Sequence, residues 1–237
     1  MVLLDIEGTT TPVSFVTEVL FPFARERLED FLTTLPPEER DPLVRSLGTE
    51  RQAEPPEAQA PAWCGATPDE ARASALAYLH WLMDRDRKST TLKSSQGRIW
   101  KEGYDSGAVK GALYDDVLPA FKRWTASGRR LAIFSSGSVQ AQRLLFAHST
   151  AGDLTGFLSA YFDTTTGPKR EADSYRKIAR ALACPPDDVL FLSDVVAELE
   201  AAAEAGLRTA LCVRRETEAD TPRGSGPPSI RTFDDLD

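Results

Sequence analysis

Short apolar runs, each ended by small or acidic residues, recur along the 237-residue chain. Their length and continuous hydrophobicity are typical of strands buried on both faces of a parallel sheet. The runs are Val2–Leu4, Leu131–Phe134, Val189–Leu192 and Thr209–Val213, with Ser159–Phe162 as a weaker candidate. Helical patterns lie between most of them, at Asp115–Ser127, Val139–His148, Glu171–Ala183 and Val195–Ala205. This alternation predicts an α/β fold with a doubly wound parallel sheet.

A long segment of different character separates the first two predicted strands. Apolar residues at spacings of three and four predict helices at Phe15–Leu35 and Pro68–Asp86, with a Pro-, Glu- and Ala-rich exposed linker at Thr49–Pro61 between them. The segment is too long for one crossover between neighbouring strands. We therefore expect a helical cap, residues 16–108, inserted after the first strand of a core formed by residues 1–15 and 109–237.

Two further segments are distinguished by their turn-forming residues. The glycine-rich return segment Gly97–Tyr114 is expected to contain the hinge of the insertion. The polar segment Glu216–Pro228 holds several prolines and glycines, and we expect it to be irregular and mobile.

Composition narrows the functional classes. The formal net charge of −8 argues against a nucleic-acid partner, since phosphate backbones are bound by basic surfaces. No apolar run is long enough to span a membrane and none has the form of a signal peptide, so the cytoplasm is the expected compartment. Three widely spaced cysteines, Cys64, Cys184 and Cys212, have no metal-binding spacing and are expected to be reduced thiols.

The strongest candidate chemistry lies where the predicted strands end, because ligands of doubly wound sheets bind beyond the carboxyl ends of the strands. Asp5 ends the first strand and can act as a nucleophile or metal ligand, and Glu7 can transfer a proton. Asp194 follows the run VLFLS, with Glu198 one helical turn later, and carboxylates beside Asp5 would suit Mg²⁺. Taken alone, a pair such as Asp5 and Glu7 is more often a turn or helix-capping pair, and Asp194 can also be an N-cap.

Two other segments offer groups for an anion. The serines of Ser135–Ser138 precede a predicted helix, where hydroxyl and backbone N–H groups bind anions, although plain helix capping would use one of these serines. Lys169 lies between a Gly-Pro turn and a predicted helix, and it can neutralise a phosphate or simply be a solvated surface lysine.

The order of these signals carries more information than any one of them. A strand ending in Asp-x-acid-Gly-Thr, then strand-Ser, then Lys, then strand-Asp resembles the motif series of the haloacid dehalogenase superfamily. Six stretches resemble its enolase-phosphatase E1 (acireductone synthase) family more closely: DIEGTTTPVSFV, FPFAR, QGRIWKEGY, IFSSGSVQAQ, GPKREADSY and FLSDVVAELEAA. Glutamate in place of the superfamily's usual second aspartate is typical of that family. The resemblance extends to about Val213.

The resemblance implies specific catalytic roles. Asp5 would be the nucleophile that forms an aspartyl phosphate, and Glu7 the acid/base that protonates the leaving oxygen and then activates water. Asp5, Asp194 and, through its backbone carbonyl, Glu7 would bind one Mg²⁺ per subunit.

It also implies the groups that hold the substrate. Ser135 and Ser136 match the substrate-binding pair, and Lys169 matches the phosphate-binding lysine. Glu198 is a further candidate for orienting the metal shell.

The implied activity is that of a phosphomonoester hydrolase in methionine salvage. Members of the family enolise 2,3-diketo-5-methylthiopentyl-1-phosphate and then remove phosphate to give 1,2-dihydroxy-3-keto-5-methylthiopentene. The apolar thioether end of such a substrate should meet Phe15, Phe21 or Trp100, although each of these side chains could equally serve helix packing. The resemblance also implies a monomer.

Two other functions remain open from the sequence. One is a different phosphatase or phosphomutase with the same type of inserted cap, acting on a small sugar phosphate. The other is a phospho-acceptor receiver module, which uses Asp, Mg²⁺, Ser/Thr and Lys as well. The order of the motifs and the long insertion disfavour the receiver module, because a receiver has its acidic pair first and its phosphorylated Asp later.

Overall fold

The computed structural model describes residues 1–214 and 227–236. The chain forms two compact units, an α/β unit made of Met1–Thr17 with Gly107–Asp237 and a helical unit made of Glu18–Ser106. Most of the segment expected to be irregular, Glu216–Pro228, lies outside the described residues. No helix in the described part of the chain is long and apolar enough to cross a membrane.

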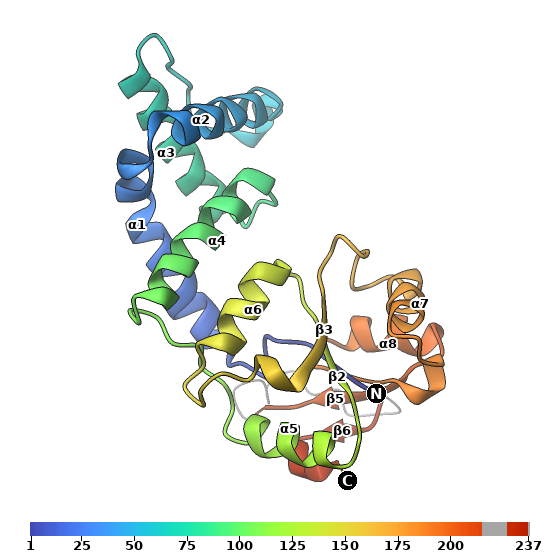
Figure 1. The fold of residues 1–237 in the computed structure, drawn as a ribbon. Coiled ribbons are helices and arrows are strands. Elements are labelled where there is room, and N and C mark those ends of the chain that lie inside the picture. The colour runs from blue at the N-terminus through green and yellow to red at the C-terminus, as the bar shows by residue number, and fades with distance from the viewer. Residues whose placement is uncertain (215–226, 237) are drawn as a thin grey trace. The chain divides into compact units, whose positions relative to one another are not determined.

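The α/β unit is built on a parallel sheet of six strands in the order β3-β2-β1-β4-β5-β6 (Figure 1). The strands are β1 (Val2–Leu4), β2 (Leu131–Phe134), β3 (Leu158–Phe162), β4 (Leu190–Ser193), β5 (Arg208–Cys212) and β6 (Ser229–Ile230). The predicted fold class is confirmed. β1 and β2 have the predicted bounds, β3 to β5 differ from prediction by one residue, and β6 was not predicted.

The strand order fixes where the two halves of the sheet diverge. From β1 the chain adds β2 and β3 on one side, then crosses to add β4, β5 and β6 on the other. β1 is therefore the central strand, with β2 and β4 as its neighbours in register from Val2 onward. The switch point lies between β1 and β4, and doubly wound folds bind ligands beyond the carboxyl ends of the strands at this point.

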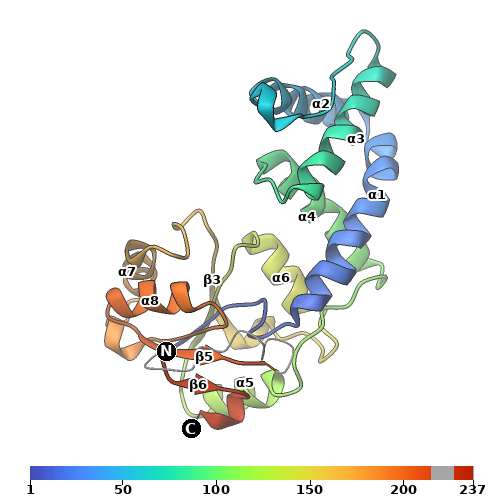
Figure 2. The ribbon, with the colours of Figure 1, turned by 180° about the vertical axis from the view of Figure 1, so that it is seen from behind.

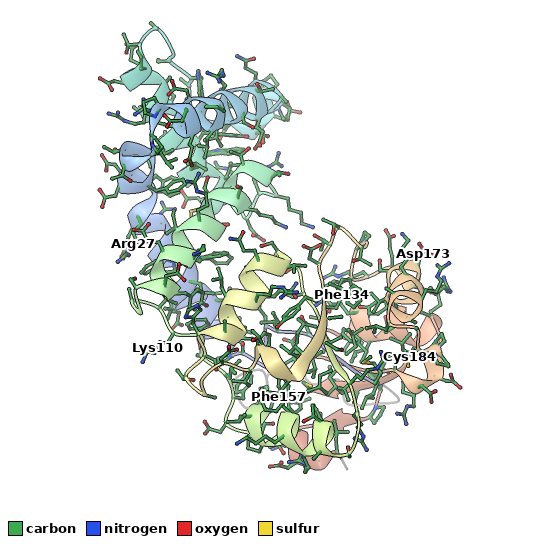
Figure 3. All side chains as sticks on the ribbon, in the orientation of Figure 1. Arg27, Lys110, Phe134, Phe157, Asp173 and Cys184 are labelled. Atoms are coloured by element: carbon green, nitrogen blue, oxygen red, sulfur yellow. The ribbon has the colours of Figure 1, made fainter. Side chains whose placement is uncertain are left out.

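Helices cover both faces of this sheet. They are α5 (Val117–Ala126), α6 (Val139–Ala147), α7 (Ala172–Ala181) and α8 (Val196–Glu204), with short 3₁₀ turns η3 (Thr155–Phe157), η4 (Pro186–Asp188) and η6 (Phe233–Asp235). α7 and α8 lie side by side (Figures 1 and 2). Tyr175 of α7 contacts Phe134 of β2 and Phe191 of β4, with ring centroids 5.5 and 5.1 Å away. Among the labelled side chains of Figure 3, Phe134 lies in this apolar core.

The helical unit has its own apolar core. It contains the last part of the π-helix η1 (Phe15–Leu20), then α1 (Phe21–Thr34), α2 (Pro37–Gln52), η2 (Pro56–Ala58), α3 (Pro68–Asp84) and α4 (Thr90–Asp105). Leu28 of α1, Leu47 of α2 and Leu79 of α3 are fully buried in one cluster. A capping box at Thr67 and Glu70 starts α3. Because leucines from three of its helices share one buried cluster, the unit has an apolar interior of its own.

Two helices of this unit were missed because their sequences contain helix breakers. α2 has Pro42 in its interior, and its last residues occupy the first part of the predicted linker Thr49–Pro61. α4 runs through Gly97 and Gly103 of the predicted glycine-rich return segment. Both glycines are buried, where a missing side chain permits close packing and tertiary contacts outweigh weak helix propensity.

Candidate active site

Asp5 lies at the carboxyl end of the central strand. Its backbone N–H donates to Leu192 O of β4 at 2.9 Å, which continues the ladder by one residue. The residue is 5% exposed. Its Oδ1 accepts a hydrogen bond from Ile6 N at 2.7 Å. The carboxylate is thus fixed at the switch point of the sheet.

The loop after Asp5 is a compact turn. Ile6 O accepts hydrogen bonds from the N–H groups of Thr9, Thr10 and Thr11, at 3.2, 2.9 and 2.9 Å. Gly8 has a φ of +64°, and a Cβ at this position would lie 2.1 Å from Asp194 Oδ2. Only glycine fits both the backbone and the neighbouring carboxylate. Glu7, half-buried, is carried by this turn between Asp5 and Gly8.

Lys169 joins two carboxylates. Its Nζ lies 2.6 Å from Asp5 Oδ1 and 2.7 Å from Glu198 Oε2, and its side chain is 9% exposed. Burial alone would lower the pKa of this lysine, but the negative charges of Asp5 and Glu198 outweigh burial and raise the pKa. Lys169 is therefore a buried, fully charged cation rather than a solvated surface lysine.

The first turn of α7 fixes the backbone that carries Lys169. Tyr175 OH donates to Lys169 O at 2.6 Å, and Ser174 Oγ donates to Pro168 O at 2.7 Å. A Cβ on Gly167, where φ is +150°, would lie 2.3 Å from Ser174 Oγ, so the loop approaches the helix closely. Two neighbouring carbonyls before the helix are thereby held in place.

The end of β4 supplies two more polar groups, Ser193 and Asp194, and Glu198 lies in the first turn of the following helix α8. Ser193 Oγ lies 3.1 Å from both Asp5 Oδ2 and Glu198 Oε2, and it accepts a hydrogen bond from Val195 N. Burial and the charge of Asp5 raise the pKa of Glu198, and Lys169 opposes this shift. Burial, followed by the charge of Asp5, raises the pKa of Asp194 to about 7. The site thus holds more negative charge than Lys169 balances.

Ser135 and Ser136 lie at the end of β2, the other neighbour of β1. Ser135 is buried, its N–H donates to Phe162 O at 3.2 Å, and its Oγ accepts from Gly137 N at 3.2 Å. Ser136 is exposed. Gln142 Nε2 donates to Gly137 O and Phe162 O, each at 2.8 Å, and so fixes this loop. Ser138 caps α6 through Ala141 N.

Some of the site residues predicted from the sequence are in direct contact in the structure, and others are not. Asp5, Lys169 and Glu198 are in direct contact, and Asp194 lies against Gly8 of the adjacent turn. The predicted aromatic contacts are divided between the units. Phe15 is buried in the α/β unit, whereas Phe21 and Trp100 pair in the helical unit with ring centroids 6.1 Å apart.

Sequence reasoning missed the groups that support these side chains. They are Ser193, which bridges two carboxylates, together with Ser174, Tyr175 and Gln142, which hold loop carbonyls. Their place in the sequence could have indicated them, because Ser174 and Tyr175 end the stretch GPKREADSY and Ser193 directly precedes Asp194. Their hydrogen bonds depend on the fold and cannot be read from spacing alone.

The carboxylates of Asp5 and Asp194 are the groups best suited to a metal. Within the described residues, no group of three or more His, Cys, Asp or Glu side chains is arranged to hold a metal ion. Mg²⁺ does not require three protein side chains, since it is commonly bound by one or two carboxylates and keeps several waters. The excess negative charge around Asp194 would be relieved by such a cation. The donor set therefore fits Mg²⁺.

Comparison with known proteins gives the class of this fold and site. The model of the haloacid dehalogenase-like hydrolases matches residues 1–206. The chain is 57% identical over 215 residues to the enolase-phosphatase E1 of Synechococcus elongatus, covering 90% of this chain and 87% of the relative. It is 48% identical over 240 residues to the enolase-phosphatase E1 of Sorangium cellulosum, covering 99% of this chain and 96% of the relative.

A solved structure shares the fold over the whole chain. The UTR4 protein (Unknown transcript 4 protein) of Saccharomyces cerevisiae has a TM-score of 0.79 at 33% identity, covering 100% of this chain and 99% of that one. The chain belongs to the enolase-phosphatase E1 family of the haloacid dehalogenase-like hydrolases. It is therefore an enzyme of the phosphatase class with enolase-phosphatase function. The Sorangium alignment extends past Val213, where the motif resemblance ended.

Proposed function

We propose that this chain enolises 2,3-diketo-5-methylthiopentyl-1-phosphate and then removes its phosphate, giving 1,2-dihydroxy-3-keto-5-methylthiopentene, as a step of methionine salvage. The single observation that carries the phosphatase half is the contact between Asp5 and Lys169 at the carboxyl end of β1, 2.6 Å between Oδ1 and Nζ. A carboxylate at this position needs a fixed cation, because it otherwise repels the phosphate it must approach.

Asp5 is the nucleophile in this proposal. A carboxylate oxygen forms a bond to phosphorus, the bond from phosphorus to the leaving oxygen breaks, and an aspartyl phosphate results. Lys169 lies between Asp5 and Glu198 and offsets the repulsion between Asp5 and the incoming phosphoryl oxygens. Ser193, hydrogen-bonded to Asp5 Oδ2, restricts the rotation of the carboxylate. The acceleration of this covalent step comes from how the residues position the reacting groups and balance their charges.

Glu7 is the proton-transfer group. It donates a proton to the leaving oxygen when the aspartyl phosphate forms, and then takes one from the water that hydrolyses it. Glu7 follows Asp5 by two residues in the compact turn stabilised by Ile6 O, which supports this role. Ser135 and Ser136, at the end of the neighbouring strand, are the groups we assign to the substrate.

Asp5, Asp194 and the backbone carbonyl of Glu7 would hold one Mg²⁺. When bound, this ion would supply positive charge against the phosphoryl oxygens and acidify the C–H beside the diketone. The chain's own carboxylates suit it, since burial, followed by the charge of Asp5, raises the pKa of Asp194 to about 7.

Residues 16–108 are the cap in this proposal, and the thioether end of the substrate contacts its aromatic side chains. Phe21 is 37% exposed, which leaves apolar surface for a ligand, whereas Phe15 is only 6% exposed. Trp100 Nε1 donates to Leu20 O at 2.8 Å and so fixes the indole beside Phe21. Phe21 and Trp100 are therefore the better candidates of the three. The family resemblance also supports a monomeric, cytoplasmic enzyme.

The test is to mix the purified protein with the diketo phosphate and Mg²⁺, and to follow phosphate release together with the ultraviolet absorbance of the conjugated enediol. Both signals should appear, and both should vanish with EDTA and return with added Mg²⁺. Phosphate release from general phosphate esters, with the diketo compound left unchanged, would instead support a phosphatase or phosphomutase for sugar phosphates. Loss of neither signal with EDTA would contradict the metal assignment.

A further inference from the structure

Arg214, two residues after the end of β5, is a buried cation outside the site described above. It is 4% exposed, and its Nη1 pairs with Asp116 Oδ2 at 2.6 Å. The guanidinium contacts the faces of two aromatic rings, 4.4 Å from the centroid of Tyr114 and 4.5 Å from that of Phe233. Burying a charge is unfavourable unless it is well paired, so this arrangement requires an explanation.

Arg214 Nη1 also donates to Arg231 O of the C-terminal segment at 3.2 Å, while two other donors point to the turn that carries Glu7. Nε and Nη2 both donate to Thr9 O, at 3.1 and 2.6 Å. The next carbonyl of the same turn, Thr10 O, accepts from the backbone N–H of Tyr114 at 3.0 Å. Two neighbouring carbonyls of the turn are therefore fixed from outside, one by the guanidinium and one by the residue whose ring stacks on that guanidinium.

We propose that Arg214 is a positioning residue for proton transfer by Glu7. The internal hydrogen bonds of the turn give it its shape, while Arg214 fixes its position relative to the sheet. Asp116 orients the guanidinium by accepting from Nη1, and it also accepts from Phe233 N at 2.6 Å. Arg214 acts through Thr9 O and does not touch the reacting atoms. This inference rests on the role proposed for Glu7.

The geometry explains why arginine is needed. Its planar group presents several donors at fixed angles, and here two of them meet one carbonyl while a third meets a carboxylate. A lysine ammonium could pair with Asp116 but would lose the two-donor contact with Thr9. A shift of the turn should move Glu7 with little change at Lys169, which is fixed by α7.

The experiment compares Arg214→Gln and Arg214→Lys with wild-type protein. We expect Arg214→Gln to lower kcat by up to about 100-fold, the loss that a misplacement of about 1 Å can cause. The inhibition constant of inorganic phosphate should stay within about twofold, the scatter of independent sites. Arg214→Lys should recover part of kcat. If Arg214→Gln fails to fold, the variant Arg214→Met with Asp116→Asn removes both charges together and should show the same loss of kcat.

Arg123→Gln is the matched control. Arg123 binds the same C-terminal segment, through Phe233 O at 3.0 Å and Asp234 at 3.0 Å, rather than the turn. Its kcat should stay within about twofold of wild type. An equal loss of kcat in Arg123→Gln, or a folded Arg214→Gln with normal kcat, would overturn the proposal, because Arg214 would then only hold the C-terminal segment.

A double-mutant cycle separates this inference from the function on which it rests. In a Glu7→Gln background, Arg214→Gln should change kcat by less than about twofold, since the group it positions is already gone. A full multiplicative loss would mean that Arg214 acts on something other than proton transfer by the Glu7 carboxylate. If Glu7→Gln itself leaves kcat unchanged, the role proposed for Glu7 fails first, whatever Arg214 does.

Discussion

The two units of this molecule use charged side chains in opposite ways. The α/β unit buries an acid–base cluster around Lys169, which is 9% exposed in its pairs with Asp5 and Glu198. In the helical unit, typical ion pairs lie at the surface, as in Arg25 with Asp84, whose side chains are 42% and 53% exposed. Surface pairs contribute little to stability, whereas buried charges carry a desolvation cost that pairing only partly offsets.

This difference indicates which charges are kept for chemistry. The more buried carboxylates of the helical unit, Glu50 and Glu54, bind partners of the same unit. Glu50 accepts from Ser89 Oγ, and Glu54 accepts from Tyr78 OH at 3.1 Å and pairs with the exposed Arg87 at 2.6 Å. These hydrogen bonds hold helices together. In the α/β unit, one buried cluster of charges, Asp5 with Lys169 and Glu198, instead lies at the carboxyl ends of β1 and β4, where the sheet can present it to a ligand.

The largest effect is expected for Asp5→Asn. We predict that phosphate release falls by at least about a thousandfold, since a nucleophile is removed rather than weakened. The fold should persist, because asparagine has nearly the same size and Lys169 retains Glu198 as a partner. Steady-state phosphate release and a thermal unfolding curve measure the two effects.

Asp173→Asn is the matched control for this change, because Asp173 is an exposed carboxylate of α7 that pairs with Lys177 at the surface (Figure 3). It should leave phosphate release near the wild-type rate. Normal turnover by Asp5→Asn would rule out the covalent mechanism and remove the functional side of the comparison between the units.

A smaller effect is expected for Lys169→Ala. Losing a charged hydrogen-bonding partner of phosphate should raise KM and the inhibition constant of inorganic phosphate by about 10- to 100-fold, with a smaller effect on kcat. Inhibition of turnover by inorganic phosphate measures this. Lys177→Ala, which removes a half-exposed lysine from the same unit, should change neither constant. If both variants behave alike, the buried pair with Asp5 has no role in binding phosphate.

Much of the fold could be predicted because its signals are local. Runs such as Val2–Leu4 and Leu131–Phe134 are short, apolar and ended by polar residues, and both strands have the predicted bounds. α2 and α4 were missed because Pro42, Gly97 and Gly103 disfavour helix in isolation. Their helical state depends on packing within the unit, which local propensity does not describe.

In the candidate site, too, residues with a local sequence signal could be predicted, and residues that depend on tertiary contacts could not. Asp5 and Lys169 could be proposed from their motifs, and the structure adds their direct contact. Arg214 gave no signal, since it stands beside a second arginine before a polar stretch, where solvated residues are the common outcome. Its burial depends on Asp116 and Thr9, which are distant in sequence and meet it only in the folded sheet.

The smallest effects are expected for two substitutions in the helical unit, which compare how apolar and charged side chains contribute to its free energy of unfolding. Leu28 is fully buried, and Leu28→Ala should cost about 2 to 5 kcal/mol of unfolding free energy, through lost burial and the cavity left behind. Arg25→Gln breaks the exposed pair with Asp84 and should cost less than about 1 kcal/mol. Denaturant unfolding can be followed by tryptophan fluorescence, since Trp63, Trp81 and Trp100 lie in this unit. Equal costs would mean that surface charge, and not the apolar interior, holds the helical unit together.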